Sequence, residues 1–73
     1  MMKRIPFNDL FQINANGSIT PKVRIGIGGV TMGPGVSFGR GVSFSGIDLT
    51  LYIGRDFQVE ETNGLYLIKG VYN

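Results

Sequence analysis

The chain offers few side chains for acid–base or nucleophilic chemistry. Histidine and cysteine are both absent, which removes the commonest general base, thiol nucleophiles and thiolate metal sites. Of the five carboxylates, only Glu60 and Glu61 are adjacent. Neighbouring residues of a strand point to opposite faces, so these two carboxylates cannot form an acid–base pair. The sequence therefore predicts a protein that is not an enzyme, with no cofactor and no metal site.

Two further features bear on anion binding. Gly26–Gly29 is rich in glycine, but a dinucleotide-binding loop would need a third glycine where Thr31 stands, followed by a helix. These glycines therefore indicate tight turns. The net charge is +2 and the basic residues are scattered. In an alternative function, Arg24, Arg40 and Arg55 would join exposed aromatic side chains to bind single-stranded nucleic acid or another anionic ligand.

Length and composition favour association between copies. The 73 residues, of which 12 are glycine and 16% are charged, allow one domain spanning 1–73. A chain of this size buries a small core, and it has no disulfide to support it. Oligomerisation is the device that remains, and a surface with few charges is compatible with it. We therefore expect the protein's main partner to be itself, in a homo-oligomer.

The N-terminal third predicts a hairpin. Apolar residues at Phe11 and Ile13 alternate as in a short strand, and Asn14–Gly17 is a turn signal. We interpret residues 10–24 as a β-hairpin, preceded by one helical turn near Asp9.

The C-terminal third predicts a second hairpin. Residues 57–62 alternate between apolar and polar, and Asn63-Gly64 is the dipeptide most typical of a two-residue hairpin turn. The return strand would cover residues 65–72.

Both faces of this return strand carry apolar side chains. Tyr66, Ile68 and Tyr72 fall on one face by simple alternation, and Leu65, Leu67, Lys69 and Val71 fall on the other. A strand of this kind is either central between two layers or lies at a subunit interface. The hypothesis is that Tyr66, Ile68 and Tyr72 form the oligomer interface.

The middle of the chain contains a repeat with a six-residue step. Its units are Val30–Gly33, Val36–Gly39 and Val42–Ser45, joined by Pro34-Gly35 and Arg40-Gly41. If each unit is extended, its first and third side chains share one face and the hydroxyl residue lies on the other. The residues expected to point inward are Val30, Met32, Val36, Phe38, Val42 and Phe44, and those expected outward are Thr31, Ser37 and Ser43.

Residues 30–45 resemble the hexapeptide repeat of left-handed β-helix proteins. The matching positions are Met32, Phe38 and Phe44 in the first place, Gly33, Gly39 and Ser45 in the second, and Val36 and Val42 in the fifth. The resemblance implies a short β-solenoid. Phenylalanine is bulkier than the aliphatic residue of that pattern, and the six-residue step breaks outside this stretch. Many members of that family are trimeric acyltransferases with a histidine base, which this chain lacks.

Taken together, the sequence predicts a small all-β domain of five to seven short antiparallel strands, barrel-like or sandwich-like, with a glycine-rich hexad ribbon. A short β-solenoid is the alternative. The expected function is a non-enzymatic structural or interaction module, with nucleic-acid or anion binding as the alternative. No apolar run approaches the length of a membrane helix, so we expect no membrane partner and a cytoplasmic location.

Overall fold

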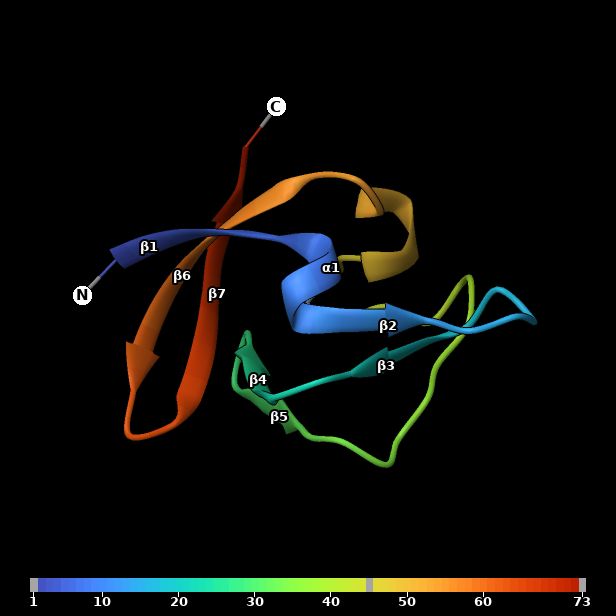
Figure 1. Ribbon diagram of the computed structural model, residues 1–73, viewed down its shortest axis with the longest axis horizontal. Helices are drawn as coiled ribbons and strands as arrows, with labels where there is room; N and C mark the ends of the chain where they lie inside the picture. Colours follow the sequence, from blue (N-terminus) through green and yellow to red (C-terminus); the bar gives the residue numbers. More distant parts are fainter. Residues whose placement is uncertain (1, 45, 73) are drawn as a thin grey trace.

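The computed structural model describes residues 2–44 and 46–72 and is built from short strands (Figure 1). Ser45, assigned above to the third hexad, lies outside the described residues. The elements are β1 (Met2–Pro6), α1 (Phe7–Leu10), β2 (Phe11–Ile13), β3 (Ile19–Pro21), β4 (Arg24–Ile27), β5 (Val30–Met32), the 3₁₀ turn η1 (Leu49–Tyr52), β6 (Asp56–Thr62) and β7 (Leu65–Val71). The predicted all-β class is confirmed.

Five strands form one sheet in the order β1-β6-β7-β4-β5, and β2 and β3 form a second, two-stranded sheet. All strand pairs are antiparallel except β4 with β7. These two strands run parallel, and their pairing begins with Arg24 opposite Leu65 and ends with Gly26 opposite Leu67. The larger sheet is open, with β1 and β5 at its edges, so it does not close into a barrel. Among the described residues of the hexad ribbon, 30–44, β5 is the only strand, and isolated bridges follow at Phe38 and Phe44. These described residues do not form stacked solenoid coils.

Both predicted hairpins are present. Asn63 and Gly64 have φ of 50° and 79°, the two positive values that a type I′ turn requires, and they join β6 to β7 where Thr62 pairs with Leu65. The N-terminal hairpin pairs Phe11–Ile13 with Ile19–Pro21. The helical turn expected near Asp9 is α1.

The core lies between the inner face of the five-stranded sheet and the segments that cover it, namely α1, the β2–β3 hairpin and η1 (Figure 1). The Phe7 ring stacks on Phe11 at 4.9 Å between ring centres and lies 6.0 Å from Phe57 of β6. The buried apolar residues come from both layers, and they are Phe7, Leu10, Phe11, Ile19, Ile25, Ile27, Met32, Leu49, Phe57 and Val59.

Only part of the predicted inward face of the hexads points inward. Met32 is buried, and Phe38 and Phe44 are half-buried against the core. The prediction is wrong for the valines of the three units, Val30, Val36 and Val42, whose side chains are 40%, 49% and 42% exposed. Gly35 and Gly41 have φ of 101° and 89° and turn the chain after the first and second units. Because the ribbon turns this often, it returns only one side chain per hexad to the core.

Candidate functional site

The residues predicted to form an oligomer interface do not share one face of β7. Tyr66 and Ile68 are half-buried and pack against the core. The Tyr72 ring instead lies under the Arg4 guanidinium, whose carbon is 4.3 Å from the centre of the ring. The cause is a β-bulge. Val59 pairs with Ile68, but Gln58 pairs with Gly70, so Lys69 is an extra residue in β7. The extra residue reverses the alternation, and the predicted grouping of Tyr72 with Tyr66 and Ile68 is wrong.

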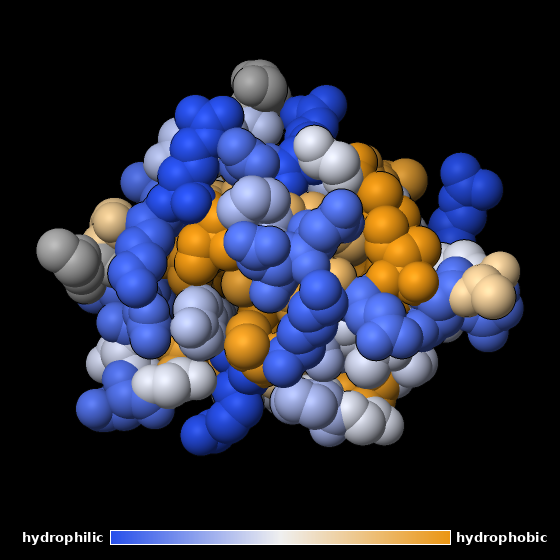
Figure 2. Space-filling view, in the orientation of Figure 1, coloured by the Kyte–Doolittle hydropathy of each residue, from blue (hydrophilic) through white to orange (hydrophobic). Residues whose placement is uncertain are grey.

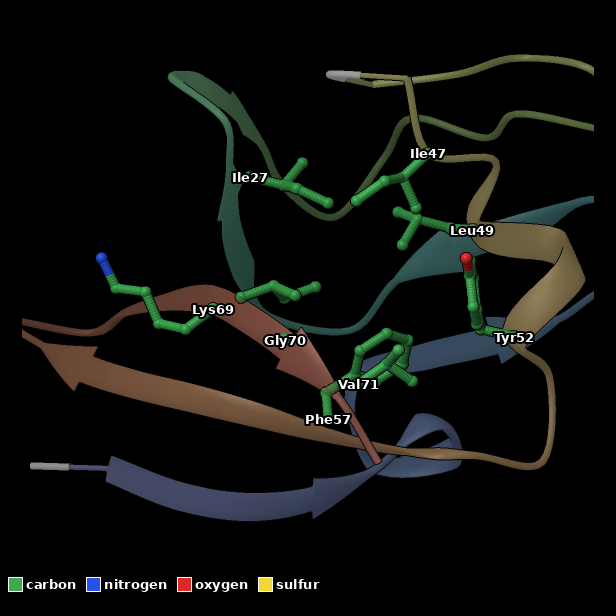
Figure 3. A pocket seen from close by; sticks show the side chains of 9 residues that line it. Ile27, Ile47, Leu49, Tyr52, Phe57, Lys69, Gly70 and Val71 are labelled. Carbon is green, nitrogen blue, oxygen red and sulfur yellow. The ribbon is translucent and has the colours of Figure 1, made fainter. Parts of the chain in front are cut away.

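The same bulge brings Val71 to the inner face beside Ile68. Both side chains line an apolar cavity of about 100 Å³ at the C-terminal half of β7 (Figure 3). Residues from the β4 end, from the segment before η1, from η1 and from β6 complete the wall, and they are Ile27, Ile47, Leu49, Tyr52 and Phe57. The Lys69 side chain points away from the cavity (Figure 3) and lies 3.8 Å from the Glu60 carboxylate.

One edge of β7 is open along this cavity. The turn at Gly28 and Gly29, with φ of 55° and 85°, ends β4 at Ile27 and reverses the chain into β5. The pairing of β4 with β7 stops at Leu67, although β7 continues to Val71. Within residues 2–44 and 46–72, no strand pairs with β7 beyond Leu67 on the side opposite β6. The sheet therefore has a notch beside the cavity.

A second exposed apolar surface lies over η1, and we call it the Leu51 patch. Its centre is Leu51 and Ile53, whose side chains are 62% and 43% exposed. Figure 2 shows this hydrophobic area at the upper right of the molecule. A groove beside it is lined on the polar side by Arg40, Thr50 and the Asn16–Ser18 tip of the β2–β3 hairpin. An apolar centre with a polar rim is the usual anatomy of a protein interface.

Asp48 holds the Arg40 loop against η1. Its Oδ2 accepts a hydrogen bond from the Gly41 backbone N–H at 2.8 Å, and its Oδ1 accepts from the Thr50 hydroxyl at 2.6 Å and backbone N–H at 3.0 Å. The hydrogen bond from the Thr50 side chain, followed by that from Gly41, holds the pKa of Asp48 below its ordinary value. This carboxylate therefore has a structural role as the cap of η1.

The other end of the molecule carries ion pairs. Lys3 lies 2.6 Å from Glu61 and Arg4 lies 2.8 Å from Asp56, both linking β1 to β6. The hydrogen bond and charge of Lys3 lower the pKa of Glu61, and Glu61 in turn raises the pKa of Lys3. Together with the Lys69–Glu60 pair, these contacts leave few carboxylates for any other role.

The three arginines proposed as anion ligands lie in different parts of the fold. Arg24 begins β4, while Arg40 lines the groove beside the Leu51 patch. Arg55 precedes β6, and its guanidinium lies 5.9 Å from the centre of the Tyr52 ring. The structure does not bring the three together in one groove among those described here.

The aromatic side chains of the ribbon are not presented as stacking surfaces. Phe38 and Phe44 meet edge to face at 4.9 Å between ring centres, and Phe38 also contacts Phe11 edge to face at 6.4 Å. Both rings pack against the core. Their position favours the core role over base stacking.

Neither a metal site nor a membrane-spanning helix is found among the described residues. No group of three or more acidic, histidine or cysteine side chains in residues 2–44 and 46–72 is placed to hold a metal ion. None of the helical segments in that same part of the chain has the length and apolar character needed to cross a bilayer.

Neither the notch nor the Leu51 patch follows from the sequence patterns described above. The notch depends on where β4 ends, and the glycine pair at Gly28-Gly29 was identified only as a turn. The bulge had a signal in Lys69-Gly70, which interrupts an otherwise apolar strand. Leu51-Tyr52-Ile53-Gly54 is similar in sequence to a hexad unit, and nothing in its residue types distinguishes an exposed leucine from a buried one.

Comparison with known proteins found no matching family model, no matching curated protein and no matching solved structure. The proposed function therefore depends on the geometry of this chain.

Proposed function

We propose that this protein is a non-enzymatic interaction module that acts as a homo-oligomer. The observation that carries the proposal is the Leu51 patch. Leu51 is the most exposed of the large apolar side chains described, at 62%, and Ile53 lies beside it in the same groove wall. A second copy would remove both side chains from water, and full burial of one leucine is worth about 1.5–3 kcal/mol.

The position of the patch on the fold supports this role. η1 is anchored from below by Leu49, which is fully buried, and is capped by Asp48. A side chain on an anchored segment loses little further freedom when it is buried by a partner, so less of the association free energy is lost to ordering. Arg40 and the Asn16–Ser18 tip supply a polar rim for hydrogen bonds across the interface.

The distribution of charges supports a role without catalysis. Glu60, Glu61 and Asp56 lie in ion pairs, and Asp48 accepts three hydrogen bonds from Gly41 and Thr50. Such carboxylates stabilise the fold and are poorly placed to act as general bases. The proposal is also favoured over anion binding, because Arg24, Arg40 and Arg55 come from different segments of the fold and because Phe38 and Phe44 pack against the core.

The test is the mass of the protein in solution. Size-exclusion chromatography with light scattering, over a range from micromolar to millimolar protein, should give a mass that rises above the 7.9 kDa of one chain. A constant mass of one chain across the whole range would contradict the proposal.

A further inference from the structure

We propose that the open edge of β7 at Ile68–Val71 binds an extended peptide segment of another protein, with one apolar side chain of that segment entering the adjoining cavity. This inference goes beyond the proposed homo-oligomer. It concerns the notch in the sheet and does not use the Leu51 patch.

The C-terminal half of β7 has an open strand edge. β7 pairs with β6 along its whole length, but its pairing with β4 ends at Leu67, and no described strand takes up the remaining edge. Backbone N–H and C=O groups along a strand edge need hydrogen-bond partners once water is excluded. An extended chain supplies donors and acceptors at the matching spacing, which is how peptides add to sheet edges.

An apolar cavity lies next to this edge. Its wall is formed mainly by apolar side chains from several parts of the fold, among them Ile27, Ile47 and Val71 (Figure 3). The cavity has a volume of about 100 Å³. An engineered apolar cavity of roughly 150 Å³ in another protein holds one benzene molecule, so the two volumes are of the same order. The space therefore suits one aliphatic or small aromatic side chain, which would give the edge its specificity.

The strand edge and the cavity are both accessible from solvent. Gly70 has no side chain, and the bulge directs Lys69 outward to Glu60, so neither residue covers the backbone on the side of the cavity. Val71 and Ile47, both at the cavity wall, are 37% and 36% exposed. A ligand can therefore reach both the strand edge and the cavity from solvent.

The shape of the recess and the charge of the chain favour a single extended peptide as the occupant. The open edge is recessed between the β4–β5 hairpin and the segment that carries Ile47 and Leu49, since residues of both line the same cavity. A single extended strand fits such a recess better than the edge of another folded domain. The exposed edge strand β1, by contrast, carries Lys3, Arg4 and Pro6, residue types that discourage strand addition. Because the chain has a net charge of +2, acidic residues flanking the apolar side chain would favour binding.

The experiment uses a capped peptide with the sequence Glu-Thr-Leu-Thr-Val-Thr-Glu as the probe. It is titrated into ¹⁵N-labelled protein, and chemical shifts of the backbone amides are followed. The expected result is saturable perturbation centred on Ile68–Val71, Ile27 and Ile47. Two control peptides separate the contributions: one has serine in place of leucine and valine, and the other has N-methyl groups on alternate amides. Both should bind at least tenfold more weakly.

Two protein variants complete the test. Val71→Phe fills the mouth of the cavity and should weaken binding at least tenfold, while Val42→Phe, at a valine of similar exposure that lines neither the cavity nor the groove, should leave it unchanged. Equal binding of the serine or N-methyl peptide, or perturbation centred on Leu51, would overturn the inference. It would also be overturned if the Ile68–Val71 amides shifted with protein concentration alone, because the occupant would then be a second copy.

Discussion

The Asp48 carboxylate and the Gly41 backbone N–H are joined by a 2.8 Å hydrogen bond that ties the hexad ribbon to η1. Asp48 also accepts hydrogen bonds from the hydroxyl and backbone N–H of Thr50. One side chain therefore holds both the loop at Gly41 and the η1 turn, the two segments beside the Leu51 patch. The described residues between Met32 and Leu49 have little regular secondary structure of their own. The shape of the ribbon there depends on contacts of this kind.

Replacing Asp48 should therefore loosen the ribbon before it affects the sheet. In Asp48→Ala, the amides of Gly41 and Thr50 lose their acceptor, and we expect their hydrogen exchange to accelerate more than that of β6 and β7. Asp48→Asn is the matched control, because its amide oxygen can still accept one of these bonds. Uniform acceleration across the whole chain would show that Asp48 acts on global stability instead.

The acid side of the stability profile should depend on Asp48 and Glu61. Their pKa values in the folded protein lie below the ordinary 3.8 and 4.5, so at low pH the unfolded chain binds more protons than the folded one. Their stabilisation is thus present above the ordinary values and is lost as the pH falls through the lowered ones. Urea denaturation between pH 7 and pH 2 should show this fall, and the double variant Asp48→Asn, Glu61→Gln should flatten it.

A core substitution should remove a large part of the stability. Phe57 is 1% exposed and contacts the Phe7 and Tyr52 rings. Phe57→Ala should cost about 3–5 kcal/mol, which is large against the total of about 4–11 kcal/mol expected for a chain of this length. Denaturant unfolding measures the loss. Val36→Ala, at a side chain 49% exposed, is the control and should change stability by less than about 0.5 kcal/mol.

Two glycine substitutions should have opposite effects. Gly64 occupies the left-handed region at φ 79°, so Gly64→Ala should destabilise the β6–β7 hairpin by about 1–2 kcal/mol. Gly39 has no positive φ, and an added Cβ would meet nothing within 4 Å. Gly39→Ala should therefore stabilise the protein by about 0.4–1 kcal/mol, through the entropy of the unfolded chain. Thermal melts compare the two, and equal effects would contradict this account of the turn.

Association through the Leu51 patch should respond to a single charge. Leu51→Asp places an unpaired carboxylate where the leucine would be buried, and we expect the dissociation constant of the oligomer to rise about 10- to 100-fold. Val36→Asp is the matched control, because Val36 is also exposed but does not line the groove. Light scattering measures both. The same loss of association in the two variants would remove the Leu51 patch as the interface.

Local signals predicted the strands well but failed where one residue changed the register. The Asn63-Gly64 turn and the alternation of residues 57–62 depend on neighbours in sequence, and both were found in the structure as expected. The assignment of Tyr72 to the face of Tyr66 assumed unbroken alternation. The extra residue Lys69 is accommodated only because β6 lies alongside, with Gln58 opposite Gly70, and such pairing is not visible along a single strand.

The sequence by itself determined the all-β class, the turns and the absence of histidine and cysteine chemistry, because these follow from residue types and short-range backbone preferences. Tertiary structure decided which apolar side chains are buried. Val36 and Val42 repeat the pattern of Phe38 and Phe44, yet only the phenylalanines reach the core. It also decided that β4 ends beside Ile68 and leaves an edge of β7 open. These outcomes depend on contacts between segments far apart in the chain, where the space available in the folded core selects among side chains of similar hydrophobicity.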